Sequence, residues 1–377
     1  MPPHHKIYPS LAMDEVMRVF SQQHHESLAP IHFAFGQSSF NPFDYVNMQL
    51  THTALGKSRS YGQIKGLMSL RELICRDYQE QFDYDLSPER VFITDGASGG
   101  LVMAMALLLE AGGELILAES CFPAYRPLAT MFNAQCKFAP LNENYTFDLE
   151  ALAKLISPKT QAIIVNSPSN PHGAVLSAEA LEAITRQGVP VVFDEVYQAL
   201  PLTNEPVPSA IKFSDQHFVV NSFSKSLAVA GFRVGYLIVP EVHSTVMTNL
   251  KAIVNVCTNW PNQIIVRELF NHWDELIAEH RKMLIKNWQI CKLTANQLGL
   301  KMLSEPKAGF FAMIDVSQTG RDSRQIALDL VRDFALSSVP GIDFQDHDTG
   351  FLRLNFAGPT EEIEVGLQRL STYLAEF

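Results

Sequence analysis

The feature that most constrains the fold is a series of short apolar runs that alternate with helical stretches. Each run is continuously apolar, which is typical of strands buried on both faces of a sheet. Helical patterns follow several runs, at 98–110, 123–133 and 177–187. This predicts an α/β fold with a mostly parallel sheet covered by helices on both faces, a three-layer α/β/α arrangement. The runs are VFIT (91–94), ELILAES (114–120), QAIIVNS (161–167), VPVVFDE (189–195), HFVVNSF (217–223) and GYLIVP (235–240).

The pattern changes after about residue 241. Long helices are predicted to about residue 298, and KMLSEP (301–306), GFFAMIDV (309–316) and FLRLNFAG (351–358) are then predicted as antiparallel strands separated by helices. We therefore expect a large domain over residues 45–275 and a smaller α+β domain formed by residues 1–44 and 276–377. Ligands of parallel sheets bind beyond the carboxyl ends of the strands, where the motifs described below lie.

Composition and charge argue against several classes of protein. The 377 residues carry a formal net charge of -11, which disfavours a general nucleic-acid or anionic-membrane binder. The longest apolar run, residues 101–109, has about half the length that spans a bilayer. The N-terminal sequence lacks the features of a secretory signal, so we expect a cytoplasmic protein. The five cysteines are scattered without a CxxC pair, and we expect neither a metal site nor a disulfide framework.

Two motifs at strand ends are candidates for contacts with a ligand, and the first of them suits a phosphate. DGASGG (95–100) opens a helix, and exposed amides beside small side chains such as Ala97 and Ser98 form an anion cradle. A helix cap with tight packing explains the same residues equally well. NSPSNPHG (166–173) follows another run, and Asn170 either points its amide into the cleft or belongs to a plain turn.

VVFDEVY (191–197) places Asp194 at the end of a buried apolar strand. A buried carboxylate needs a partner, which a cationic ring nitrogen, an arginine or a helix terminus would supply. Tyr197 lies just past the strand end. Glu195 is expected to face away from the cleft and to be structural.

NSFSKSLAVAGFRVGY (221–236) places a single lysine, Lys225, among Ser222, Ser224 and Arg233. Serine and arginine are good phosphate ligands. A lysine near cations, or removed from water, has a lowered pKa and becomes nucleophilic, so it forms a Schiff base with an aldehyde. A phosphate cradle, a carboxylate for a ring nitrogen and an imine-forming lysine together specify pyridoxal 5'-phosphate (PLP).

With these motifs in this order, the chain from about residue 7 to residue 374 resembles the fold-type I PLP-dependent enzymes of the class I/II aminotransferases, the aspartate aminotransferase superfamily. The resemblance implies that Lys225 carries PLP as a Schiff base and shuttles the proton between the substrate Cα and the cofactor. It implies that Asp194 contacts the pyridinium nitrogen, and that Tyr197 and Asn170 contact the phenolate oxygen. The remaining cofactor contacts implied are Phe122 of ESCFPAY (119–125) on the ring and Ala97, Ser98, Ser222 and Arg233 at the phosphate.

The resemblance also implies substrate contacts and a protein partner. Arg353 of FLRLNFA (351–357) matches the arginine that binds the substrate α-carboxylate, with Gly36 of FAFGQSSF (33–40) and Asn170 beside it. Tyr61 of YGQIKG (61–66) matches a tyrosine that reaches the phosphate of the neighbouring subunit, which implies a homodimer with shared active sites. Two alternatives stay open: Arg353 as a sheet-edge arginine paired with an acid such as Asp343, and Tyr61 as a packing residue.

A few residues indicate the reaction and the substrate. Related carbon–sulfur β-lyases tend to have histidine where this chain has Tyr197, so we predict transfer of the α-amino group of an L-amino acid to a 2-oxo acid by a ping-pong mechanism. A PLP-dependent lyase or cyclase of specialised amino-acid metabolism is the alternative. The segment VCTNWPNQ (256–263) has no arginine or lysine for a second carboxylate, which favours neutral or aromatic amino acids. Phe40 and GFFAM (309–313) either line an apolar pocket or pack in the core.

Three features depart from the family pattern. Gly99 and Gly100 lie in the cradle where larger residues are frequent, and His172 lies in NPHG where threonine is common. The acidic run DFQDHDTG (343–350) either reaches the cleft or is solvated, and we expect it to be solvated.

Overall fold

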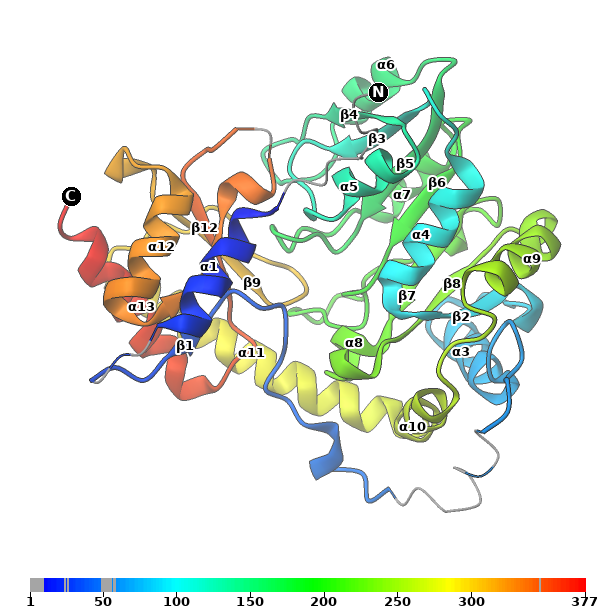
Figure 1. Cartoon of the computed structure of the whole chain (residues 1–377), viewed down its shortest axis with the longest axis horizontal. Coiled ribbons are helices and arrows are strands. Elements are labelled where there is room, and N and C mark those ends of the chain that lie inside the picture. Colours follow the sequence, from blue (N-terminus) through cyan, green and yellow to red (C-terminus); the bar gives the residue numbers. More distant parts are fainter. Residues whose placement is uncertain (1–9, 24, 26, 49–55, 57–58, 346) are drawn as a thin grey trace, which may run out of the picture.

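The structure is a computed structural model that describes residues 10–23, 25, 27–48, 56, 59–345 and 347–377. Figure 1 shows a larger part built on a seven-stranded sheet and a smaller part built on a three-stranded sheet. The long helix α11 (Trp273–Gln297) runs between them. The predicted fold class, a three-layer α/β/α unit with a smaller α+β unit, is confirmed.

The strand order of the large sheet is β2-β8-β7-β6-β5-β3-β4. β8 pairs antiparallel with β2 and β7, and all other neighbouring strands of this sheet are parallel. All six apolar runs form strands, whereas β4 was not predicted because its QCKFA sequence lies at the edge and is mostly only partly buried. The bounds are β2 (Val91–Asp95), β3 (Glu114–Ala118), β4 (Gln135–Ala139), β5 (Thr160–Asn166), β6 (Val191–Asp194), β7 (Phe218–Ser222) and β8 (Val234–Ile238).

Two hydrophobic cores cover the two faces of this sheet. On β6, Val191 and Phe193 pack into one core and Val192 packs into the other, which is why the run is continuously apolar. Helices α3 (Met68–Phe82), α6 (Leu149–Leu155), α7 (Ala178–Thr185) and α10 (Trp260–Phe270) cover the first face. Helices α4 (Gly96–Leu108), α5 (Tyr125–Met131) and α9 (Ser244–Val254) cover the second. A single helical turn, α8 (Phe223–Ser226), follows β7.

The smaller part has its own core. Its antiparallel sheet has the order β11 (Val339–Pro340), β12 (Phe351–Asn355) and β9 (Phe311–Asp315), and β1 (Ile31–His32) pairs with β10 (Leu336–Ser337). Helices α1 (Ala12–Gln22), α12 (Ser323–Phe334) and α13 (Thr360–Leu374) pack around these strands. The strand predicted at KMLSEP is wrong: this segment makes one isolated bridge, between Met302 and Ile314, and then reaches Pro306, which has no amide hydrogen for a ladder.

Helix α11 connects the two parts. Leu276 near its start packs in a core of the large sheet, and Leu284, Trp288 and Cys291 pack in the core of the smaller part. The division into residues 45–275 and residues 1–44 with 276–377 stays a proposal, since this one helix belongs to both cores. Within the described residues, no helix is both long enough and apolar enough to cross a membrane.

Candidate active site

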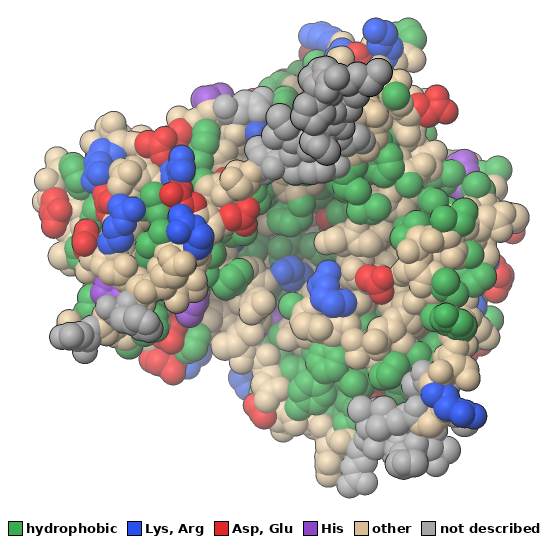
Figure 2. All heavy atoms as spheres, viewed as in Figure 1, with side chains coloured by type: hydrophobic (Ala, Val, Ile, Leu, Met, Phe, Trp, Pro, Cys, Tyr) green, Lys and Arg blue, Asp and Glu red, His purple; other side chains and the backbone are tan. Residues whose placement is uncertain are grey.

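A cavity of about 220 Å³ lies at the edge of the large sheet where β2, β5, β6 and β7 end. Figure 2 shows this face hollowed between the two parts, with basic side chains visible in the hollow. Every predicted site residue except Tyr61 lines the cavity. They are Gly36, Ala97, Ser98, Phe122, Asn170, Asp194, Tyr197, Ser222, Lys225, Arg233 and Arg353. Tyr61 does not line this cavity, and its side chain is 86% exposed.

The start of α4 forms one wall. Ala97 and Ser98 line the cavity, directly after Gly96 with φ +70°. A Cβ at Gly96 would lie 2.4 Å from Arg233 Nη2, and a Cβ at Gly235 would lie 2.8 Å from the backbone nitrogen of Ala97. The two glycines therefore let the guanidinium and β8 lie against the helix start, where backbone amides lack helical acceptors. This arrangement fits a phosphate.

Lys225 lies on α8, which begins where β7 ends. The hydroxyl of Ser222 caps this turn by accepting from the Ser224 amide at 3.1 Å. Lys225 Nζ donates to the carbonyl oxygen of Gly36 at 2.5 Å. Burial, and then two nearby arginines, lower the pKa of Lys225 to about 8. The neutral, nucleophilic amine is thus far more populated at neutral pH than in a free lysine.

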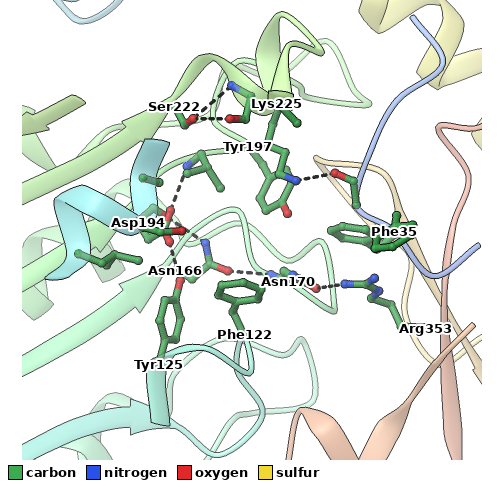
Figure 3. A pocket seen from close by; sticks show the side chains of 18 of the residues that line it. Phe35, Phe122, Tyr125, Asn166, Asn170, Asp194, Tyr197, Ser222, Lys225 and Arg353 are labelled. Carbon is green, nitrogen blue, oxygen red and sulfur yellow. Dashed lines mark hydrogen bonds between the residues drawn. The ribbon is translucent and has the colours of Figure 1, made fainter. Parts of the chain in front are cut away.

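Asp194 ends β6 and is 4% exposed. The Tyr125 hydroxyl donates to its Oδ2 at 2.7 Å, and the Val196 amide donates to its Oδ1 at 3.3 Å (Figure 3). Burial raises the pKa of Asp194 to about 6, against the opposing effect of these hydrogen bonds and of Lys225. A protonated ring nitrogen in the cavity is a partner that would stabilise the charged carboxylate.

A chain of hydrogen bonds connects the sheet edge to the smaller part (Figure 3). Asn166 ends β5 beside Asp194, and its Nδ2 donates to the Asp194 carbonyl oxygen at 2.9 Å. Its Oδ1 accepts from the Asn170 amide at 2.8 Å. The Asn170 side-chain oxygen accepts from Arg353 Nη1 at 3.1 Å. Asn170 is therefore fixed by both parts of the molecule, with Tyr197 lining the same cavity.

Arg353 on β12 is a buried cation at the cavity wall, 4% exposed. Its guanidinium carbon lies 4.1 Å from the ring centroid of Phe311, and Nη2 donates to the Ala34 carbonyl oxygen. Its Nε is buried without a hydrogen-bond partner among the described residues. Burial lowers the pKa of Arg353 to about 10, so the group stays charged at neutral pH. A buried guanidinium with an unsatisfied donor suits a carboxylate ligand.

Asp343 has a different role from those expected of it. It is 7% exposed, and its carboxylate accepts from the amides of Ala12 at 2.7 Å and Met13 at 2.8 Å. It therefore binds the N-terminus of α1, so the expectation that it is solvated is wrong, and its hydrogen bonds go to α1 rather than to Arg353. His347 in the same run is exposed, as expected.

Other expected side chains have structural surroundings. Glu195 is 1% exposed, points away from the cavity and accepts from Ser209 Oγ at 2.7 Å, which confirms its structural role. His172 is 1% exposed and stacks on Tyr145 with ring centroids 4.4 Å apart. Phe40 packs in a core, whereas Phe311 lines the cavity.

Sequence reasoning missed Tyr125 and Asn166. Both lie in stretches that it singled out, ESCFPAY and NSPSNPHG. Only their positions in the sequence indicated a role at the site. Tyr125 follows Phe122 by three residues, and Asn166 is near the end of the apolar run 161–167. The sequence does not contain the register that pairs Asn166 of β5 with Asp194 of β6. It also does not contain the packing of α5 that brings the Tyr125 hydroxyl to the Asp194 carboxylate.

Comparisons with known proteins agree with this geometry. The model of the family described as aminotransferase class I and II matches residues 31–370. The valine–pyruvate aminotransferase of Mycobacterium tuberculosis is 31% identical over 324 residues, 83% of each chain. Aromatic-amino-acid aminotransferase 2 of Thermococcus litoralis is 25% identical over 360 residues, 92% of each chain. A crystal structure of an aminotransferase from Mycobacterium tuberculosis has a TM-score of 0.89 at 28% identity and covers 98% of both chains.

The fold and the cavity define a PLP-dependent enzyme of fold type I. The chain belongs to the class I and II aminotransferases, and it is a PLP-dependent aminotransferase. The residues present fit the cofactor, because the glycine-lined cradle, the buried carboxylate of Asp194 and the amine of Lys225 face one cavity.

Proposed function

We propose that this aminotransferase moves the α-amino group of an L-amino acid with a neutral or aromatic side chain to a 2-oxo acid by a ping-pong mechanism. The observation that carries the proposal is the convergence of Lys225, Asp194 and Arg353 on one cavity. These three groups supply a nucleophilic amine, a buried negative charge and a buried positive charge, which are the needs of the cofactor and of an amino-acid substrate.

When bound, PLP supplies an aldehyde that bonds a lysine amine and an electron-poor ring that accepts the electron pair of a Cα–H bond. Lys225 would hold the cofactor through its side-chain amine, and the free amine would move the proton from the substrate Cα. Asp194 keeps positive charge at the ring nitrogen, and Tyr125 holds the Asp194 carboxylate in place. The other proposed cofactor contacts are Tyr197 and Asn170 at the ring oxygen, Phe122 on the ring face, and Ala97, Ser98, Ser222 and Arg233 at the phosphate.

The charges around the cavity support an uncharged substrate side chain. Among the described residues that line it, the basic ones are Lys225, Arg233 and Arg353. Each has a proposed role at the cofactor or the α-carboxylate, which leaves none for a second carboxylate. Met13, Phe35 and Phe311 line the same cavity and offer apolar surface to a neutral or aromatic group. Gly36 lies beside Lys225 and is proposed to contact the substrate through its backbone.

Exposed apolar side chains support the proposed homodimer. Tyr61 is 86% exposed, and on α9 and its flanks Val242 is 74% and Ile253 is 84% exposed. Burial of these side chains against a second copy of the chain would remove exposed apolar surface from water. We propose that Tyr61 reaches the phosphate of the neighbouring subunit. Location in the cytoplasm stays a prediction.

A single half-reaction tests the proposed chemistry. The PLP-loaded protein is mixed with each L-amino acid without any 2-oxo acid, while the cofactor spectrum and ammonia are followed in the same tube. We expect pyridoxamine 5'-phosphate and an equal amount of 2-oxo acid, most rapidly with neutral or aromatic donors. Ammonia release with unchanged cofactor would instead identify a lyase, and a nitrogen-retaining product without a 2-oxo acid would identify a cyclase.

A further inference from the structure

Lys251 is a buried cation that the proposed mechanism does not use. It lies in the last turn of α9 and is 0% exposed. Its Nζ donates to Asn255 Oδ1 at 3.0 Å and to Thr258 Oγ1 at 3.1 Å, both neutral acceptors. Burial lowers the pKa of Lys251 to about 8, against the opposing effect of the Asp95 carboxylate, so it is mostly charged at neutral pH. A fully buried charge is costly unless it is paired or hydrogen-bonded, so this placement calls for a physical reason.

The hydrogen bonds of Lys251 lead to the phosphate cradle. Asn255 Nδ2 donates to Asp95 Oδ2 at 2.7 Å. Asp95 ends β2 directly before Gly96, and its carbonyl oxygen accepts from Arg233 Nη2 at 3.4 Å. Asp95 is thus part of the turn that forms the cradle. The chain Lys251–Asn255–Asp95 connects a buried positive charge to a carboxylate at the cradle.

This placement addresses an electrostatic conflict. Asp95 directly precedes α4, and its exposed carboxylate caps no amide of the helix, so it adds a negative charge near the positive helix end where a phosphate is proposed to bind. Its negative charge also repels a bound phosphate. The positive charge of Lys251, connected to Asp95 through Asn255, reduces that repulsion without occupying the cradle. The side-chain amide of Asn255 lies between the two charges, and its hydrogen bond fixes the orientation of the Asp95 carboxylate.

We infer that Lys251 is a positioning residue for the cofactor phosphate: through Asn255 it orients Asp95 and offsets the negative charge of Asp95 at the cradle. The inference rests on the proposed phosphate site at the start of α4. Lys251 acts through other residues and does not touch the phosphate itself. A lysine that only holds the turn between α9 and α10 would not make phosphate affinity depend on the charge of Asp95.

The test compares two ligands on full-length protein freed of cofactor. Pyridoxamine 5'-phosphate and pyridoxamine differ only in the phosphate, and neither has the aldehyde that bonds Lys225. Titration calorimetry gives the Kd of each. We expect Lys251→Met to weaken binding of pyridoxamine 5'-phosphate about tenfold, the scale of one hydrogen bond to a charged group, and to leave pyridoxamine binding unchanged. The double variant Lys251→Met/Asp95→Asn is expected to return the affinity to within about twofold of wild type.

Several results would overturn the inference. They are an unchanged phosphate affinity in Lys251→Met, an equal loss for both ligands, or a double variant as weak as the single one. If Lys251→Met does not fold, as judged by circular dichroism, Asn255→Ala interrupts the same chain at a half-buried position. The same loss and the same rescue by Asp95→Asn are expected there, and their absence overturns the inference. If wild-type protein itself does not prefer the phosphorylated ligand, the proposed phosphate site is wrong.

Discussion

Asp194 is buried at a strand end where its charged form is costly. Because burial raises its pKa from 3.8 to about 6, the cofactor-free folded protein binds the proton more tightly than the unfolded chain. Its contribution therefore makes stability fall as the pH rises from about 4 to about 6, with the loss complete above that window. We predict that Asp194→Asn raises the free energy of unfolding of the cofactor-free protein at pH 7 by up to about 3 kcal/mol, measured by urea denaturation.

The same substitution is expected to lower kcat of the PLP-loaded enzyme by roughly 10²–10³-fold, because a preorganised negative charge at the ring nitrogen is lost. Denaturation at pH 3.5 is the control, since wild type and variant are then both neutral at this position and the gain in stability is expected to vanish. An Asn variant that is less stable than wild type at pH 7 would contradict the claim that burial dominates the pKa of Asp194.

Arg353 offers a second test among single residues. Its side chain is buried, and Nε lacks a partner among the described residues. Arg353→Lys keeps the charge but removes the planar pair of donors, so we predict a KM for the amino acid that rises roughly 10²-fold. The Kd for pyridoxamine 5'-phosphate is expected to stay at the wild-type value. Steady-state kinetics and calorimetry measure the two, and an unchanged KM would argue against the carboxylate role.

The role of a single residue was predictable where that residue type is unusual for its place in the sequence. A lysine among serines and a carboxylate ending an apolar strand need an explanation, which is why Lys225 and Asp194 were found. The roles of Tyr125 and Asp343 could not be predicted in this way, because each depends on its hydrogen-bond partner in the folded protein. The partner of Tyr125 is the Asp194 carboxylate, and the partners of Asp343 are backbone amides of α1. Asp343 binds α1, more than 300 residues away in the chain, and no local pattern contains that information.

Among the elements, α1 carries a cavity residue and depends on a distant cap. Met13 lines the cavity, and Asp343 accepts from the first amides of the helix. We predict that Asp343→Ala lowers the free energy of unfolding by about 1–2 kcal/mol, the usual value of a helix cap. It is also expected to raise KM severalfold, because Met13 is less well fixed. Urea denaturation and steady-state kinetics measure the two effects.

Asp322 provides a matched control for that prediction. It caps α12 by accepting from the amides of Arg324 at 2.7 Å and Gln325 at 3.3 Å, and no described residue of α12 lines the cavity. Asp322→Ala is expected to reduce stability by a similar amount without changing KM. Equal changes in KM for both variants would show that α1 has no special connection to the substrate.

Elements were predictable where burial gave a strong pattern. The six apolar runs form strands because each is covered on both faces. The edge strand β4 has a mixed pattern, since one side of the strand has no neighbour in the sheet. KMLSEP resembles a strand in the sequence because it contains apolar residues. In the structure it pairs with β9 only through the bridge between Met302 and Ile314, so it forms no ladder.

At the scale of the whole molecule, the proposed shared active sites lead to a complementation test. Lys225→Ala removes the amine, and Tyr61→Ala removes the contact proposed to come from the neighbour. In a mixed dimer, one of the two sites has both residues intact. We predict that mixing the two variants under exchange conditions restores activity at low PLP concentration. Sedimentation equilibrium checks the dimer, and no recovery from mixed dimers would show that Tyr61 serves its own chain or none.

The arrangement of the two parts was only partly predictable. Strand patterns gave a large α/β unit and a smaller α+β unit. The contact between them, from Arg353 to Asn170, joins residues 183 positions apart in the sequence. Such contacts depend on how the cores pack around α11. The family resemblance supplied this information, because the order of motifs specifies a fold in which those residues meet.

The most direct test of the account is to find which residue holds the cofactor. The PLP-loaded protein is reduced with borohydride, digested, and mapped by peptide mass spectrometry. We predict the mass of reduced PLP on the peptide that contains Lys225, and none on Lys225→Ala treated in the same way. Attachment to another lysine such as Lys251, or equal attachment to the Lys225→Ala protein, would contradict the placement of the active site.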